Sequence, residues 1–458
     1  MSIGEQDYPI NCCKMKRHWI ILTTLAGVVS GGGMAAGTEL TKPAWVTDCS
    51  VGMKEGYDNN VFMSGVDAKY LPPAYTVPAG SVAALKDRYS WITTVSPKVG
   101  VNLAPLLGSQ TNLPALTLTY APDLVVYHDQ TSESYNAQRV LAAVKGTTEP
   151  ATFGAENNFT YIDGSGMGPF YPGGLLSAFA TTVDRERRRQ IQDRANVSVQ
   201  FDWEKWFVRP TASLLYYNLM TEQLNIPGYQ NYCDRYDVNG GTDFGYKLTP
   251  QLALTLGYRY GHQYQQQYSF SPYSSSSDYQ RVLAGIEGNP WPWLNVKIAS
   301  GPDFRNYEGD SASHITPVNN LHPVEYYGEA LVTATFAPEN TLTFKYKLWQ
   351  WVSGLGKAPY SDGNYELLYH RKLTDKLAFD LGGKLISWDF NSGNLPACKR
   401  HDLQYTATTD LSYAVNSHVI CTLAYTANWG RNGEANVTNP QTREFNQQLV
   451  SLGTQWKF

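Results

Sequence analysis

The chain has 458 residues, of which 42% are hydrophobic, 13% aromatic and only 17% charged, and its formal net charge is −4. The aromatic content excludes a disordered chain, because so many rings can bury enough surface to offset chain entropy. The sequence lacks the runs of about 18 apolar residues that helical membrane proteins need. It also lacks a basic domain, so we expect no nucleic-acid partner.

The first segment predicts export. The basic cluster at residues 14–18 precedes an apolar stretch at 19–29, and small residues follow at 30–37. This order is typical of a secretory signal peptide. We therefore expect residues 1–36 to be a signal peptide, with Met15 as an alternative start, and residues 37–46 to be a short periplasmic lead. A lead of this length leaves no room for the folded plug of an energy-coupled transporter.

The body of the chain, from residue 47 to 458, alternates apolar and polar residues with a period of two. In residues 252–261, for example, Leu254 and Leu256 alternate with Thr255 and Gly257. This period predicts β-strands with one apolar face. The expected strands lie near 47–55, 89–103, 114–128, 191–203, 206–218, 232–247, 252–266, 278–288, 293–305, 324–336, 341–352, 363–371, 376–390, 401–414, 418–430 and 443–458.

The connections between these strands alternate between short turns, such as 248–251 and 337–340, and long polar segments, such as 267–277 and 306–323. Short turns on one side and long loops on the other are typical of outer-membrane barrels, as are aromatic girdles near strand ends. We therefore expect an all-β fold, a transmembrane antiparallel up-and-down β-barrel of about 16 strands in the bacterial outer membrane. The expected girdle residues are Trp203, Trp206, Trp291, Trp293, Trp349 and Trp388.

The last strand carries a more specific pattern. Val450, Leu452, Trp456 and Phe458 fall on one face when residues are counted back in twos. A terminal Phe after such an alternation resembles the signal that the barrel assembly machinery reads. We therefore expect these four residues to form an assembly signal.

Two short motifs suggest a family. Residues 57–62 read Tyr-Asp-Asn-Asn-Val-Phe, and the second strand contains Val95-Ser96-Pro97. Together they resemble the outer-membrane barrels of the "beta-barrel porin 2" type. The resemblance implies a barrel without catalytic residues and a link to exopolysaccharide secretion. The alternative interpretation of residues 57–60 is a turn, because Asp and Asn favour turns locally.

The polar face of the strands should line a lumen, because a charge facing lipid at the midplane costs roughly 2–4 kcal/mol. Sparse acidic residues on the same face predict a water-filled pore with a mild preference for anions. The expected pore-lining residues are Lys98, Arg209, Arg259, Arg281, Lys297, Lys345, Lys347, Asp380 and Lys384.

One segment, residues 129–190, is too long for an ordinary connection and is expected to be a functional loop. It could fold inward as a constriction or cover the mouth as a lid. It ends in an arginine-rich stretch at 185–189. These side chains could bind lipopolysaccharide phosphates, line the pore mouth or belong to a solvated junction.

No catalytic motif, metal site or cofactor site is predicted, and we expect no enzyme activity. His128, His262 and His401 are single histidines near the expected outer rim. The leading hypothesis is a passive diffusion channel for small hydrophilic solutes, and the alternatives are polysaccharide export or an anchor barrel with a closed lumen. The expected partners are outer-membrane lipid, lipopolysaccharide and the barrel assembly machinery.

Overall fold

The structure is a computed structural model of the whole chain. It describes residues 43–61, 63, 88–107, 115–164, 189–220, 233–266, 275–308, 320–352, 359–390, 400–432 and 445–458. Residues 44–458 form one compact unit. The expected signal peptide lies outside the described residues and stays a prediction. Within the described ranges, no helix is long and apolar enough to cross a bilayer.

The described residues form nineteen β-strands in one sheet. Their bounds are β1 Val46–Asp58, β2 Ser90–Asn102, β3 Ala115–Tyr120, β4 Asp123–Tyr127, β5 Tyr135–Thr148, β6 Ala151–Asp163, β7 Gln190–Asp202, β8 Trp206–Asn218, β9 Arg235–Thr249, β10 Leu252–Gln265, β11 Ser277–Trp291, β12 Leu294–Tyr307, β13 Val324–Ala337, β14 Asn340–Trp351, β15 Tyr360–Lys372, β16 Leu377–Phe390, β17 Arg400–Ala414, β18 Val419–Asn432 and β19 Phe445–Lys457. Two short 3₁₀ turns, Ala104–Leu107 and Thr131–Glu133, lie between strands.

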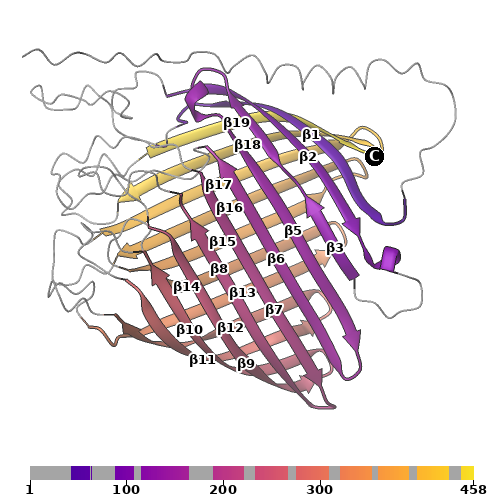
Figure 1. Ribbon diagram of the computed structural model, residues 1–458. Coiled ribbons are helices and arrows are strands. Elements are labelled where there is room, and N and C mark those ends of the chain that lie inside the picture. The colour runs from indigo at the N-terminus through magenta and orange to yellow at the C-terminus, as the bar shows by residue number, and fades with distance from the viewer. Residues whose placement is uncertain are drawn as a thin grey trace, which may run out of the picture. The chain divides into compact units, whose positions relative to one another are not determined.

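The sheet closes on itself, since β19 pairs antiparallel with β1 (Figure 1). Strands β3 and β4 share one position between β2 and β5, because both pair with each of these neighbours. They are separated by Ala121-Pro122, where proline has no N–H to continue the ladder. The described strands therefore fill eighteen positions of a closed antiparallel barrel. The expected fold class is confirmed, with two strand positions more than the predicted sixteen.

The two additional positions lie in the segment that we expected to be one long loop. Strands β5 and β6 form a hairpin there, in register from Asn136↔Asp163 to Thr148↔Ala151. The expectation of a loop over all of 129–190 is therefore wrong. The hairpin was missed because residues 140–144 are apolar in an unbroken run, which hides the period of two. Residues 165–188 lie outside the described residues, so the choice between constriction and lid stays a prediction.

The connections alternate between short turns and long segments as expected. An added hairpin contains two strands, so it does not change the edge of the barrel at which the later connections lie. At one edge the turns are short, as at 250–251, 338–339 and 373–376. The exception at that edge is the link between β2 and β3, residues 103–114. The C-terminus lies at the short-turn edge (Figure 1).

The outer face of the wall is apolar. Leu254, expected to face lipid, is 45% exposed there, and Leu256 and Tyr258 on the same strand face are exposed too. Aromatic rings gather outside at the short-turn edge, where Trp206 contacts Tyr246 with the two rings tilted, and Trp293 stacks with both Trp291 and Phe336. Most of the expected girdle is therefore in place.

Two of the expected girdle residues are exceptions. Trp349 is buried and stacks on Trp351 at 4.5 Å between ring centroids, and Trp388 packs against the same apolar group. Trp349 lies two and four residues from Lys347 and Lys345, so it shares their inward face. The girdle assignment of Trp349 and Trp388 is therefore wrong.

Candidate lumen site

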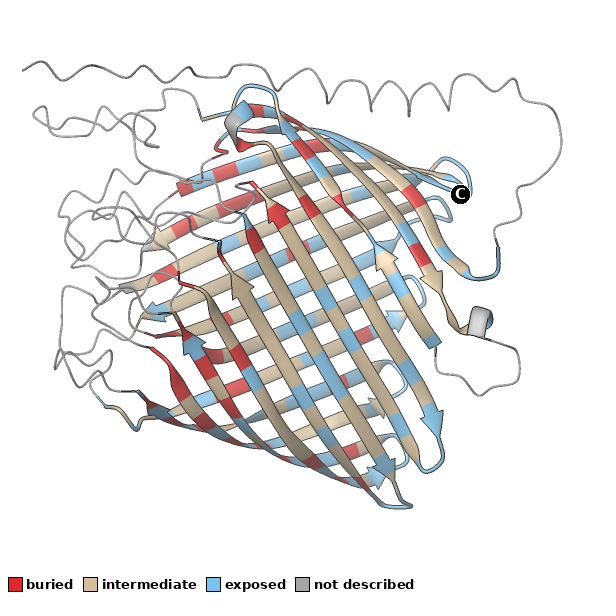
Figure 2. Cartoon of the chain, in the orientation of Figure 1, coloured by how far each residue is buried: buried red, intermediate tan, exposed pale blue. Residues whose placement is uncertain are grey.

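Buried residues gather at the long-loop ends of β9 to β12 (Figure 2). A group of charged and polar side chains fills this part of the barrel interior, and we call it the inner cluster. It comprises Asp237, Gln263, Tyr279, Arg281, Asp303, Arg305 and Gln350.

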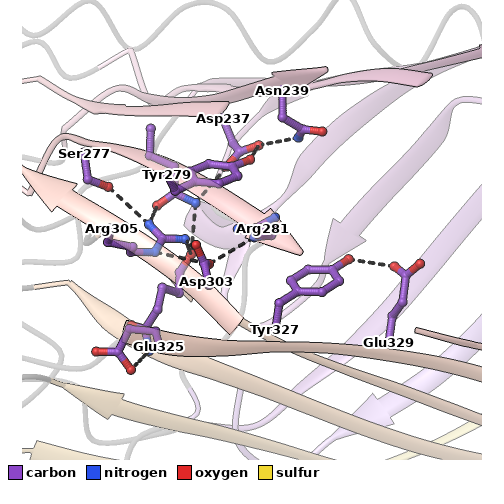
Figure 3. Close-up of polar contacts among 12 residues, drawn as sticks. Asp237, Asn239, Ser277, Tyr279, Arg281, Asp303, Arg305, Glu325, Tyr327 and Glu329 are labelled. Carbon is purple, nitrogen blue, oxygen red and sulfur yellow. Dashed lines mark hydrogen bonds and ion pairs between the residues drawn. The ribbon is translucent and has the colours of Figure 1, made fainter. Parts of the chain in front are cut away.

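The centre of the inner cluster is Asp303, whose side chain is fully buried. Its Oδ2 accepts hydrogen bonds from Arg281 Nε and from Arg305 Nη2, both at 3.0 Å (Figure 3). The two guanidinium groups also lie over the Tyr279 ring, at 4.0 and 5.0 Å from its centroid. Two buried cations are thus held by one carboxylate and one aromatic face.

The second carboxylate of the inner cluster, Asp237, accepts hydrogen bonds from Tyr279 Oη at 3.0 Å and from Gln263 Nε2 at 2.7 Å. Gln263 Oε1 in turn accepts from Arg305 Nη1 at 2.7 Å. Adjacent polar groups therefore satisfy most of one another's hydrogen bonds, while Arg281 Nη2 and Asp303 Oδ1 are buried without a hydrogen-bond partner among the residues that the structure describes.

Contacts also cross the lumen between strands that are not neighbours. Gln263 Nε2, on β10, donates to the carbonyl oxygen of Gln350, on β14, at 2.9 Å. Arg235 Nη1, on β9, donates to the carbonyl oxygen of Val352 at 2.7 Å and lies over the rings of Tyr217 and Trp351. The wall between β8 and β15 is therefore curved so sharply that its inner side chains meet.

Inward glycines allow this curvature. A Cβ at Gly241 would lie 1.9 Å from the Tyr258 carbonyl oxygen, and one at Gly261 would lie 2.3 Å from the Tyr279 ring. Only a residue without a side chain fits at either position. The absence of these side chains lets large groups such as Tyr279 point inward.

A second group of ion pairs lies closer to the short turns. Arg209 binds Glu287 through two hydrogen bonds of 2.8 Å, and its Nη2 is 3.1 Å from Asp243. Arg259 Nη2 is 2.7 Å from the other oxygen of Asp243. These four residues come from four successive strands, β8 to β11, and their charges balance.

A cavity of about 570 Å³ lies among these groups. Seven basic and four acidic side chains line it. The basic residues are Lys145, Arg194, Arg209, Arg259, Arg281, Lys297 and Lys347, and the acidic residues are Asp237, Asp243, Glu287 and Glu329. Two smaller cavities continue toward the short turns and share Arg209 with the first.

The structure places five of the nine expected pore-lining residues at this cavity, namely Arg209, Arg259, Arg281, Lys297 and Lys347. The other four lie on the same face of the sheet by register. In the register of the sheet, Glu366 is the neighbour of both Lys345 and Lys384, and Asp380 is the neighbour of Asp410. Lys98 stands beside Ser50, whose other neighbour is Lys457.

Counter-charges are less sparse than the sequence suggested. Lys98 Nζ is 2.6 Å from Asp48, and Lys345 Nζ is 3.2 Å from Glu366. Arg281 is held by Asp303, as described above. Within the described residues, Lys297, Lys347 and Lys384 have no ion pair. An excess of positive charge therefore remains at a few positions only.

Sequence reasoning missed Asp303, Arg305, Arg194 and Lys145. The signal was present for three of them. Asp303 and Arg305 are an even number of residues from Lys297, and Arg194 lies within the expected strand at 191–203. Lys145 was lost with the hairpin that contains it.

The three rim histidines do not come together. His128 Nε2 is 2.7 Å from Thr93 Oγ1, His262 Nδ1 is 2.9 Å from Asp278, and His401 Nε2 is 3.0 Å from Ser387 Oγ. Within the described ranges, no group of three His, Cys, Asp or Glu side chains could hold a metal ion. Of the arginine-rich stretch, only Arg189 is described, and it pairs with Asp163 at 3.1 Å.

A closed antiparallel wall with an apolar outer face, aromatic rings at one edge and charges inside is the architecture of an outer-membrane β-barrel. The chain is an outer-membrane β-barrel. Except for the short β3 and β4, its strands have 12–15 residues, which is long enough to cross the bilayer with a tilt.

No family model matches the sequence, and no curated protein matches it. Among solved structures, the chain is similar to OpdK of Pseudomonas aeruginosa with vanillate, at 12% identity and a TM-score of 0.40 over 90% of this chain and 98% of that one. It is also similar to OccK5 (OpdH) of the same organism, at 12% identity and a TM-score of 0.39 over 90% and 98%. The siderophore receptor PirA from Acinetobacter baumannii matches at 8% identity and a TM-score of 0.40, over 90% and 81%.

Proposed function

We propose that the protein is a water-filled passive diffusion channel of the outer membrane, with a mild preference for small hydrophilic anions, and that it is not an enzyme. The observation that carries this proposal is the cavity with its seven basic and four acidic side chains. A barrel of eighteen strand positions is too wide for side chains alone to fill, so water should occupy the remaining lumen. Charges that line a pore set its selectivity.

The route through the barrel is supported by the two smaller cavities, which extend the polar lining toward the short turns. They include Gln200, Lys247 and Thr147. The inner cluster occupies part of the lumen at the long-loop end, so among the described residues the wall itself narrows the route there. Solutes would pass beside the inner cluster, along the inner faces of the remaining strands.

The test is the reversal potential of the purified protein in planar bilayers under a salt gradient. We expect wild-type protein to prefer anions, most clearly at low salt, because the Debye length is about 8 Å at physiological salt. Changing Lys345 and Lys384 together to Glu should shift the reversal potential toward cations. Both residues flank Glu366 in register, so the double variant places three carboxylates side by side. Lys376→Glu, in the short turn at 373–376, makes half of that charge change away from the strands, and it should shift the reversal potential by much less than half as much.

A wild type that prefers cations contradicts the proposed selectivity. A wild type that conducts nothing at any voltage contradicts the channel and favours the alternative of an anchor barrel closed by the inner cluster. Polysaccharide export, which the family resemblance implies, would require an acidic or neutral polymer to alter the single-channel current.

We also propose that the outward face of β19 contacts the barrel assembly machinery. Val450, Leu452, Trp456 and Phe458 all point outward and are exposed, and β19 is the strand that closes the barrel against β1. Phe458→Ser should lower the amount of heat-modifiable barrel in the outer membrane. Lys457→Ser, on the inward face of the same strand, should leave it unchanged, and equal loss in both variants would contradict the proposal.

A further inference from the structure

Four basic side chains that line the main cavity have no partner. Lys145, Arg194, Lys297 and Lys347 make no ion pair or hydrogen bond within the described residues. Their neighbours behave differently, because Arg209 and Arg259 are neutralised by Asp243 and Glu287. In one part of the cavity lining the basic side chains are therefore neutralised by ion pairs, and in the other part the positive charges have no ion pair.

Two of these groups come from distant strands and line the same cavity, Arg194 on β7 and Lys347 on β14. Lys347 is repelled by Arg194 and Arg281 and attracted by Glu329 and Asp237. These two carboxylates bind neutral donors and form no ion pair with Lys347 or Arg194: Glu329 accepts a hydrogen bond from Tyr327 Oη at 2.6 Å, and Asp237 accepts from Tyr279 and Gln263. Like charges held together in this way are stabilised when an anion lies between them.

The position of Lys347 is fixed by aromatic rings. Its Nζ lies 4.1 Å from the centroid of the Trp349 ring, and Trp351 stacks on Trp349. A cation–π contact orients the ammonium group without cancelling its charge. Because Trp349 is buried, we expect recognition at this site to depend mainly on charge.

We propose that this cavity is a binding site for a small oxyanion with at least two negative charges, held between Arg194 and Lys347. Arginine binds oxyanions through two parallel hydrogen bonds, and lysine adds a point charge. Lys145 and Lys297 offset the remaining negative charge. The volume of about 570 Å³ is within the range of small-ligand sites. The inference rests on the proposed function in one respect, namely that the ligand enters through the same lumen.

The test is calorimetric titration of the full-length barrel, purified in detergent, with inorganic pyrophosphate at constant ionic strength. Chloride at the same ionic strength serves as the monovalent comparison. We expect saturable binding of pyrophosphate, weakened about tenfold by Arg194→Gln and by Lys347→Gln, since each removes a charge-assisted contact. Lys54→Gln is the matched control, because Lys54 is another inward lysine without an ion pair and does not line the cavity.

Heat-modifiable gel mobility establishes first that each variant is folded. The proposal is overturned when folded wild-type protein binds pyrophosphate no better than chloride, when the two cavity variants bind it as tightly as the wild type, or when Lys54→Gln weakens binding equally. Binding requires no ion current, so a barrel that binds pyrophosphate but is silent in bilayers overturns the channel and leaves this site intact.

Discussion

The inner surface of the barrel has two different regions. Between β8 and β15, side chains from non-neighbouring strands meet, and Asp303 and Arg305 are fully buried. In the middle of β16 and β17 the inward charges stand in a more open space, whereas Asp402 and Asp58, at the long-loop ends of β17 and β1, are buried as well. Asp380, for example, lies 2.7 Å from His370, and their side chains are 45% and 50% exposed. Figure 2 shows dense burial at the long-loop ends of β9 to β12 and further buried residues at the long-loop ends of other strands.

The difference teaches that one alternating pattern can produce two kinds of interior. Both regions place charged residues at some inward positions of one continuous sheet. In the curved region, inward glycines of β9 and β10 leave room for the large side chains of neighbouring strands. A charge in the inner cluster is consequently a structural element, whereas a charge in the open region is available to solvent.

The strongest test of this contrast is the same substitution in both regions. Asp303→Asn should lower the free energy of unfolding by about 3–5 kcal/mol, because it leaves the buried guanidinium groups of Arg281 and Arg305 without their shared carboxylate. Asp380→Asn should cost about 0–1 kcal/mol, because its ion pair is exposed. Urea unfolding in liposomes measures both, and similar costs would remove the distinction between the regions.

A second test asks whether the contrast is confined to the inside. Leu254 on β10 and Leu381 on β16 are both exposed on the outer face, one in each region. Changing either to Arg should cost about 2–4 kcal/mol at the bilayer midplane, because lipid surrounds both regions alike. Thr255→Arg, which turns a charge toward the cavity, should be milder.

The two leucine variants would be compared by urea unfolding in liposomes, with Thr255→Arg as the control for chain position. A clearly unequal cost for Leu254→Arg and Leu381→Arg would mean that the two regions also differ in their surroundings. Equal destabilisation by Leu254→Arg and Thr255→Arg would contradict the register of β10.

Much of this fold could be predicted from the sequence, because the period of two fixes which residues share a face. The alternation of Leu254 with Thr255 predicted their opposite faces. The alternation of short turns with long segments predicted which edge of the barrel carries the short turns. The hairpin of β5 and β6 could not be predicted in this way, since residues 140–144 are apolar on both faces. A membrane strand whose inner face is also apolar carries no alternation to detect.

The candidate site was predictable only as a set of inward charges. The parity of Lys297 and Lys347 placed both on one face, but no sequence pattern showed that Arg281 is neutralised while Lys347 is not. That distinction depends on which side chains meet: Asp303, on the neighbouring strand β12, pairs with Arg281, whereas no carboxylate of the described residues pairs with Lys347. The glycines that leave room for such side chains show their role only beside the groups that they accommodate.

The smallest effect tests those glycines directly. Gly261→Ala should lower the free energy of unfolding by about 1–3 kcal/mol, because its Cβ would lie 2.3 Å from the Tyr279 ring and would push Tyr279 away from Asp237. Gly383→Ala, on the outward face of β16, is the control for the loss of glycine alone. A Cβ there meets no heavy atom within 4 Å, so the substitution should be neutral or slightly stabilising through the unfolded chain. Urea unfolding of the two variants in liposomes shows whether the loss of stability comes from the close contact with Tyr279 or from the replacement of a glycine as such. If both lose stability equally, the curved region has no special need for an inward glycine at position 261, and the inner cluster must be held together by its ion pairs alone.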